Sequence, residues 1–438
     1  MQADITAISI LIGTFALLLI LRVPITFSLI VSSIATGWYL NTPLMVVVQK
    51  LSVGVQNFSL LAIPFFILAG GIMAYGGITN RIISFSNIIV GSVRGGLAQV
   101  NVLASMFFGG ISGSAVADVS SIGVMLIPMM EKKGYDTDYS VAVTVSSACQ
   151  GIIIPPSHNM IIYAFAVGGA VSVGRLFLGG FIPGILLGLF LMIISYIIAV
   201  KKGYPKEKRY SLKEALNITR DAVIGLFTFV IIIGGVIFGV FTATESAAIA
   251  CVYALLVTIF IYQTMTFRLF IKILYEGLKT LAIVMSLIAA ASAFGYFLAF
   301  LKVPALATQA LLTLSGNRVV LLLLINVLLI LLGCIMDMAP LILICAPILY
   351  PVVVTALGMS PIQFGIMMLL NLGIGLCTPP VGSALFVGSA VGKIPIEKAA
   401  KALLPFYIMM ICVLLLITFV PFFSTFIPDL LMPELGMK

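Results

Sequence analysis

The second half of the chain repeats the first half at a fixed offset of 224 residues. Most residues that coincide under this offset are glycines and prolines, the types that dictate backbone shape in helical proteins. The coinciding residues are Arg94 with Arg318, Gly109 with Gly333, Gly134 with Gly358, Gly151 with Gly375, Pro155-Pro156 with Pro379-Pro380, and Ala166-Val167-Gly168 with Ala390-Val391-Gly392. In a membrane protein, two halves with helix-breaking residues at corresponding positions predict a secondary transporter whose binding site lies between them.

The composition is that of an integral membrane protein. Hydrophobic residues make up 62% of the chain and charged residues only 8%, far from the values of soluble domains. A segment of roughly 20 apolar residues can cross the hydrocarbon layer. Such segments occur five times in each half, at 5–21, 24–40, 60–77, 138–169 and 174–200, then at 222–240, 245–262, 280–300, 361–393 and 402–427. Because five crossings bring the chain to the opposite face, the second repeat is predicted to have inverted topology.

Two further apolar segments, 97–129 and 319–350, are interrupted in the middle by glycines or by an acidic residue. Each predicts a re-entrant hairpin. The segments 78–93 and 301–317 have mixed polarity, which favours arms that lie along the membrane surface. The predicted fold is therefore an all-α integral membrane protein with two inverted-topology repeats, about ten crossings and two re-entrant helical hairpins.

This pattern predicts a mobile transport domain, made of hairpins and broken helices, that is held by a fixed scaffold. The predicted division is 1–96 (scaffold and arm, first repeat), 97–173 (transport-domain hairpin and broken helix, first repeat), 174–221 (last crossing of the first repeat and cytoplasmic linker), 222–317 (scaffold and arm, second repeat), 318–400 (transport-domain hairpin and broken helix, second repeat) and 401–438 (C-terminal crossing).

The basic residues predict the orientation in the membrane. With the N-terminus outside, 18 of the 23 Lys and Arg residues fall on cytoplasmic segments, many of them in the linker 201–220. This agrees with the positive-inside rule. The net charge of +9 is thereby explained by topology, and no nucleic-acid partner is indicated.

The chain carries no P-loop of the GxxxxGK[ST] type, so its energy is expected to come from an ion gradient or another subunit. The six cysteines lie apart and lack CxxC spacing, which predicts packing roles and neither a metal site nor a disulfide framework.

The centre of the first predicted hairpin reads GGISGSAVAD at 109–118. Three glycines and two serines within 109–114, among them Ser112, Gly113 and Ser114, make a continuous helix costly, and they leave backbone carbonyls at membrane depth that need partners. Carbonyl and hydroxyl oxygens at such a turn suit a weakly held monovalent cation, to which Asp118 could add charge. Close helix packing through small residues is the alternative.

The corresponding centre of the second hairpin contains Asp337, which the repeat aligns with Gly113. An ionisable residue inside an apolar segment indicates function. The alternative is a local role, in which Asp337 caps the second arm of the hairpin.

Paired prolines interrupt one crossing in each half, Pro155-Pro156 in the first and Pro379-Pro380 in the second. Two successive residues without a backbone donor are expected to break the helix into two half-helices, a simple kink being the alternative. The carbonyl end of one half-helix attracts cations and the amide end of the other attracts anions. The breaks therefore favour cation-coupled movement of an anionic solute.

Two further polar positions deserve separate interpretation. His158 is the single histidine, beside the first break and next to Asn159, and it could bind the solute, relay a proton or satisfy a helix end. Glu245 follows Thr242 and Thr244 at the start of a predicted crossing, and this spacing favours a structural helix cap.

Four motifs carry a family resemblance: GGISGSAVAD at 109–118, IIPPSHNMI at 153–161, TATESAA at 242–248 and CTPPVG at 377–382. With them, nearly the whole chain resembles the DctM-like large permease of tripartite ATP-independent periplasmic (TRAP) transporters. The resemblance implies an elevator mechanism in the bacterial inner membrane, with the N-terminus in the periplasm, sodium ions as coupling ions and no other cofactor. It also implies two partners, a periplasmic substrate-binding protein and a small four-helix membrane subunit on a separate chain. The implied solutes are dicarboxylates, keto acids, sugar acids or sialic acid.

Carried over to this chain, the resemblance also implies site residues. Those implied for sodium are Ser112, Gly113, Ser114, Asp337, Gly375, Cys377 and Thr378. Those implied for the substrate are Ser157, His158, Asn159, Gly382 and Ser383.

Two other functions fit parts of the sequence. A free-standing sodium-coupled carboxylate symporter would have the same repeats and breaks but would need no partners. A rhomboid-type intramembrane serine protease would use Ser112 of a GxSG motif with His158 as base, although it leaves the second hairpin and second break unexplained. An ion channel fits poorly, because rings of repeated subunits are not indicated.

Overall fold

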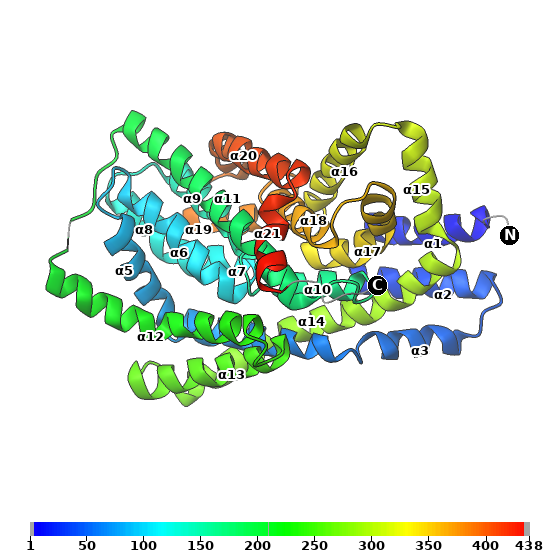
Figure 1. Cartoon of the computed structure of the whole chain (residues 1–438), viewed down its shortest axis with the longest axis horizontal. Helices are drawn as coiled ribbons and strands as arrows, with labels where there is room; N and C mark the ends of the chain where they lie inside the picture. The colour runs from blue at the N-terminus through cyan, green and yellow to red at the C-terminus, as the bar shows by residue number, and fades with distance from the viewer. Residues whose placement is uncertain (1–3, 209, 433–438) are drawn as a thin grey trace.

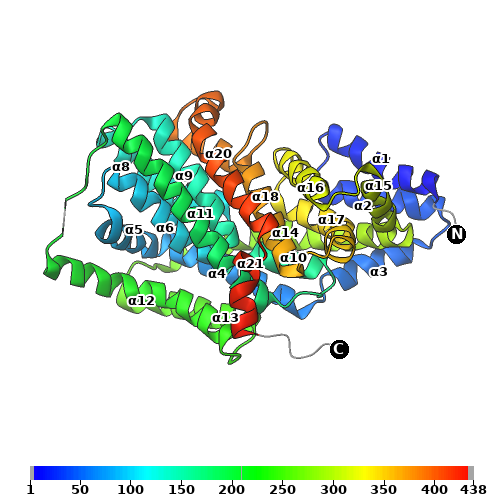
Figure 2. The ribbon, with the colours of Figure 1, turned by 45° about the horizontal axis from the view of Figure 1, so that its top comes forward.

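The computed structural model describes residues 4–208 and 210–432, and every regular element in these ranges is helical. In both views α9, α11, α20 and α18 lie side by side in the middle of the molecule, with α5 toward one end and α15 toward the other (Figures 1 and 2). The helices α12, α13 and α3 run along the lower edge in the view of Figure 1, and α14 lies next to α3.

One group of helices packs around α14, which contacts α2, α3 and α4, while α4 also packs against α13. These helices are α1 (Ile5–Ile20), α2 (Ile25–Tyr39), α3 (Leu44–Gly54), α4 (Ala62–Tyr75), α12 (Leu212–Ile237), α13 (Ala243–Leu256) and α14 (Phe267–Phe300). Two shorter helices, α5 (Ile78–Val90) and α15 (Val303–Leu314), link this group to the rest of the chain.

The second group contains the hairpins and the interrupted helices. From the first half come α6 (Gly96–Ser112), α7 (Ala115–Asp118), a π-helical turn (Val119–Gly123), α8 (Val124–Lys132), α9 (Thr137–Ile153), α10 (His158–Ala166) and α11 (Val173–Lys202). From the second half come α16 (Arg318–Gly333), α17 (Met338–Tyr350), a π-helical turn (Pro351–Ala356), α18 (Pro361–Leu376), α19 (Ser383–Gly392), α20 (Ile396–Phe419) and α21 (Phe422–Leu431).

The half-helices α9 and α18 form the centre of the molecule. Every residue of α9 from Tyr139 onward and every residue of α18 from Ile362 onward is buried. A helix that is buried on all sides carries no single apolar stripe, and the many small residues of α9 allow close approach of its neighbours.

The two halves of the chain interlock through the second pieces of these interrupted helices. The helix α10 of the first half packs on α17 of the second hairpin, and α19 of the second half packs on the π-helical turn and α8 of the first hairpin. Each hairpin is therefore held by helices from both halves of the chain.

Within the described residues, seven helical segments are long and apolar enough to cross a membrane. Six of them correspond to predicted crossings: Phe58–Tyr75, Val173–Lys202, Leu212–Ile237, Ala243–Ile261, Phe267–Phe300 and Ile396–Phe419. The seventh, Met338–Ala356, contains the second arm of the predicted hairpin at 319–350 and extends beyond it. The predicted first two crossings correspond to the shorter apolar helices α1 and α2.

Several predicted boundaries were wrong. The segment 402–427 is not one helix, because α20 ends before Pro421 and α21 begins after it. The crossing predicted at 222–240 begins earlier than expected, because α12 begins at Leu212, within the segment that was assigned to the cytoplasmic linker. The helix α3 was not predicted, because its 11 residues are too few to cross the hydrocarbon layer.

Candidate functional site

The first hairpin turns directly against the first helix break. The helix α6 ends at Ser112, Gly113 has a left-handed backbone with φ of 61°, and Ser114 caps α7 through the amide of Ala117. An ideal Cβ on Gly113 would lie 3.0 Å from both the backbone nitrogen and Nδ1 of His158. Only glycine fits this turn comfortably, for reasons of both conformation and space.

Asn159 fixes this junction. Its side-chain amide donates a hydrogen bond to the carbonyl oxygen of Gly113 at 2.9 Å. The structure thus brings Gly113, which was predicted for sodium, together with His158 and Asn159, which were predicted for the substrate.

Several buried polar groups at the first junction have no hydrogen-bond partner among the residues that the structure describes. They include the hydroxyl of Ser157, which is fully buried, and Nδ1 of His158. Asp118 on the second arm is also buried; the Ser105 side chain lies beside it, but neither group makes a hydrogen bond of good geometry. Buried polar groups without partners are rare in folded proteins and indicate a place for a ligand, ion or water.

The second hairpin meets the second break in a similar way. The amide of Val381 donates to the carbonyl oxygen of Cys334 at 3.0 Å, which ties the break to the end of α16. Asp337 stands immediately before α17, but its side chain makes no capping hydrogen bond and is exposed. Its carboxylate is thereby available for other partners, in contrast to the capping alternative.

Carbonyl oxygens gather at the second break. An ideal Cβ on Gly382 would lie 2.6 Å from the carbonyl oxygen of Thr378 and 2.9 Å from that of Leu376. Both oxygens therefore lie against the α-carbon of Gly382. Between them in sequence, the carbonyl oxygen of Cys377 accepts a hydrogen bond from the Tyr407 hydroxyl at 2.5 Å.

Leu376 and Tyr407 were missed by the sequence analysis. Leu376 adjoins the predicted residues, and the prolines that follow it signal a helix end whose last carbonyls lose their partners. Tyr407 lies on α20, far from the break in sequence, and no local pattern marks it.

Paired glycines align each hairpin with its break. An ideal Cβ on Gly151 would lie 2.5 Å from the α-carbon of Gly109, and one on Gly375 would lie 2.5 Å from that of Gly333. These four glycines are among those that coincide under the 224-residue offset. In each half, the first arm of the hairpin therefore approaches the interrupted helix at backbone distance.

Buried amides add a second contact in each half. Asn101 on α6 donates to the Thr144 hydroxyl on α9 at 2.6 Å. Asn371 on α18 donates to the Asn326 side chain on α16, also at 2.6 Å.

The two helix breaks lie on either side of the crossing between α9 and α18. The Cys377 thiol donates to the carbonyl of Val145 at 3.3 Å, and an ideal Cβ on Gly373 would lie 2.7 Å from the sulfur of Cys149.

Both Pro155-Pro156 and Pro379-Pro380 are joined by cis peptide bonds. Among the described residues, no hydrogen bond joins Ser157, His158 or Asn159 to Gly382 or Ser383, and the Ser383 hydroxyl is another buried group without a partner.

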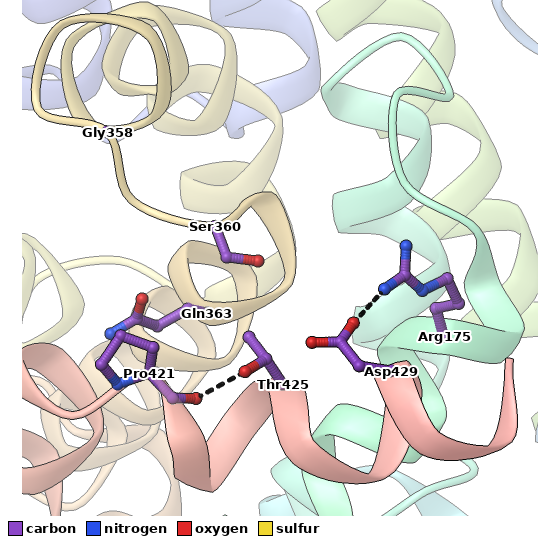
Figure 3. Close-up of a pocket in the computed structure, with 7 residues that line it drawn as sticks. All are labelled: Arg175, Gly358, Ser360, Gln363, Pro421, Thr425 and Asp429. Carbon is purple, nitrogen blue, oxygen red and sulfur yellow. Dashed lines mark hydrogen bonds and ion pairs between the residues drawn. The ribbon is translucent and has the colours of Figure 1, made fainter. Parts of the chain in front are cut away.

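A cavity of about 470 Å³ lies elsewhere, between the start of α11, the start of α18 and α21. Arg175 and Asp429 line it and form an ion pair at 2.5 Å, and Gln363 lies on the other side of the cavity, beside Pro421 (Figure 3). None of the residues predicted for sodium or substrate lines this cavity.

Residues 12–423 match the family model described as the tripartite ATP-independent periplasmic transporter, DctM component. The chain belongs to this family. It is a TRAP large permease subunit and a transporter component, not an enzyme, which leaves the protease interpretation of Ser112 and His158 without support.

Two named relatives match almost end to end. The sialic acid TRAP transporter large permease protein SiaM of Vibrio cholerae is 40% identical over 94% of this chain and 96% of its own length. The C4-dicarboxylate TRAP transporter large permease protein DctM of the same organism is 40% identical over 95% of this chain and 97% of its own.

A solved structure has a similar fold. The YdaH transporter of Alcanivorax borkumensis superposes with a TM-score of 0.61 over 87% of this chain and 88% of its own, at 15% identity. At this identity the likeness shows the fold alone.

Proposed function

We propose that this TRAP large permease imports an organic acid anion, driven by a sodium gradient, through an elevator movement of its hairpins and interrupted helices. The observation that carries the proposal is the pair of hairpin–break junctions. The first junction contains the buried Ser157 hydroxyl, which has no partner among the described residues, and the second contains the carbonyl oxygens of Leu376 and Thr378. At each junction the carbonyl end of one half-helix stabilises cations, and the amide end of the other stabilises anions.

The second junction supports sodium as the coupling ion. The carbonyl oxygens of Leu376 and Thr378 lie together against Gly382, and the Asp337 carboxylate makes no capping bond. Oxygen ligands of this kind suit a hard monovalent cation and not a soft transition metal. The predicted sodium residues Ser112, Gly113 and Ser114 would form the corresponding site at the first junction.

The first junction supports an acid as the solute. The Ser157 hydroxyl and the N-terminal amides of α10 stand at the start of a helix, where an anion is favoured. His158 and Asn159 would add donors, and Gly382 with Ser383 would close the site from the second half. The relatives named for sialic acid and for C4-dicarboxylates favour solutes of this acid class.

The packing supports an elevator with inverted repeats. The group around α14 would form the scaffold, and the interlocked hairpins and half-helices would move as one body. The proposed scaffold spans residues 1–96 and 222–317, and the proposed transport domain spans residues 97–173 and 318–400. The N-terminus would lie in the periplasm and the chain in the bacterial inner membrane.

The partners can be tested by purifying the tagged chain in mild detergent from its native membrane and identifying the co-purifying proteins by mass spectrometry. A stoichiometric small four-helix subunit would support the tripartite assembly and lead to the periplasmic binding protein. A chain that purifies alone, and takes up a carboxylate with sodium in liposomes without other proteins, would instead be a free-standing symporter.

A further inference from the structure

The three carbonyl groups at the second break have different neighbours. Those of Leu376 and Thr378 lie against the α-carbon of Gly382, whereas that of Cys377 is bonded to the Tyr407 hydroxyl of α20. Tyr407 therefore contacts the one carbonyl of the three whose oxygen is not among the atoms nearest to an ideal Cβ on Gly382.

We propose that Tyr407 is a positioning residue for cation binding at this break. By holding the Cys377 carbonyl on the side of α20, it keeps the carbonyls of Leu376 and Thr378 on the side of Gly382, where a monovalent cation is bound. Tyr407 itself does not touch the cation. The inference rests on the proposed sodium coupling and adds a residue outside the repeat motifs.

The hydrogen bonds around the break show why Tyr407 is needed. The Thr378 hydroxyl is anchored by the carbonyl of Ile374 at 2.7 Å, and the Thr378 amide by that of Gly375 at 2.9 Å. The peptide group between Cys377 and Thr378 is thus fixed at its amide by α18 and at its carbonyl by Tyr407. No other donor to the Cys377 carbonyl occurs among the described residues.

Removing the phenol hydroxyl would leave this carbonyl without a donor inside the membrane, which is unfavourable. The peptide group between Cys377 and Thr378 could then rotate toward another hydrogen-bond donor. This rotation would move the carbonyls of Leu376 and Thr378 away from Gly382. The cation site would lose its preorganised geometry, while the substrate groups at the first junction would keep theirs.

The test compares Tyr407→Phe with Tyr163→Phe. Tyr163 donates to the carbonyl of Pro361 at 2.8 Å, so the control also removes a phenol hydroxyl from a backbone acceptor of α18, but at the opposite end of that helix. Both variants are measured in the complete transporter with its small subunit and loaded binding protein. The readouts are the sodium concentration for half-maximal uptake and the substrate KM at saturating sodium.

For Tyr407→Phe we expect the half-saturating sodium concentration to rise about threefold to tenfold, the range expected for loss of one hydrogen bond, with little change in substrate KM. Tyr163→Phe should leave sodium half-saturation unchanged. An unchanged value in Tyr407→Phe, or an equal shift in both variants, would overturn the inference.

A binding measurement covers the case in which transport by the variant is too slow to analyse. Sodium should raise the melting temperature of the purified wild-type chain, and Tyr407→Phe should need about threefold to tenfold more sodium for the same rise. Equal sodium titrations would count against the role of Tyr407. A wild-type transporter that works equally well without sodium would instead refute the proposed coupling itself.

Discussion

At the scale of single residues, glycine is required where two backbones meet. An ideal Cβ on Gly109 would lie 2.2 Å from the α-carbon of Gly151, and one on Gly151 would lie 2.5 Å from that of Gly109, well inside van der Waals contact. Because backbone atoms cannot move aside as a flexible side chain can, a larger residue must push α6 and α9 apart. The offset between the two halves revealed these positions from the sequence, although it could not show that they touch.

Gly151→Ala should therefore destabilise the chain by about 1–3 kcal/mol, the usual cost of overpacking a tight interior, and should reduce uptake. Gly295→Ala is the matched control, since Gly295 also lies in a helix but has no atom within 4 Å of an ideal Cβ. The control should be neutral or slightly stabilising. Equal melting temperatures for the two variants would show that the Gly109–Gly151 contact is not tight.

At the scale of elements, the hairpins and broken helices are held by a few buried polar contacts. The helix breaks and turns could be predicted from sequence because proline and glycine act locally on the backbone. The helix cap at Glu245 could be predicted for the same reason, and it is confirmed by the capping box that Thr242 and Glu245 form. The contact of Tyr407 with Cys377 could not be predicted from the sequence, because it depends on how α20 packs against the end of α18.

The amide pair of α16 and α18 offers a test at this scale. Asn371→Leu would leave the Asn326 side-chain oxygen buried without its donor, which costs about 1–3 kcal/mol. The double variant Asn326→Leu with Asn371→Leu should recover part of this loss, because both partners are then apolar. Thermal unfolding of the purified variants measures the loss of stability. If the double variant loses as much stability as the two single variants together, the coupling between Asn326 and Asn371 is contradicted.

At the scale of the whole molecule, the linker between α11 and α12 binds both ends of the first hairpin. The carbonyl of Pro205 accepts from the amide of Gly95 at 3.1 Å, and Glu207 pairs with Lys133 at 3.2 Å. Tyr204 stacks on Tyr135 with ring centroids 4.5 Å apart. The sequence showed this segment only as a basic linker, because its contacts are long-range.

The same linker region gives a pH prediction. Hydrogen bonds from Lys202, and then from Tyr204, hold the pKa of Asp136 below its usual value. A lowered carboxyl pKa contributes stability that is present above the unfolded-state pKa of about 3.9 and is lost as the pH falls through the folded-state value. Asp136→Asn should thus lower the melting temperature at pH 7, and the difference from wild type should narrow below about pH 4. A difference that stays constant across this range would contradict the role of the charge.

The central claim is that a sodium gradient drives an organic acid through this permease. The most direct measurement is uptake of labelled acid into liposomes that contain the chain and its small subunit, with the loaded binding protein outside. We predict uptake when sodium is higher outside, and none when the gradient is abolished or when potassium replaces sodium. Uptake of equal rate under all three conditions would contradict the account.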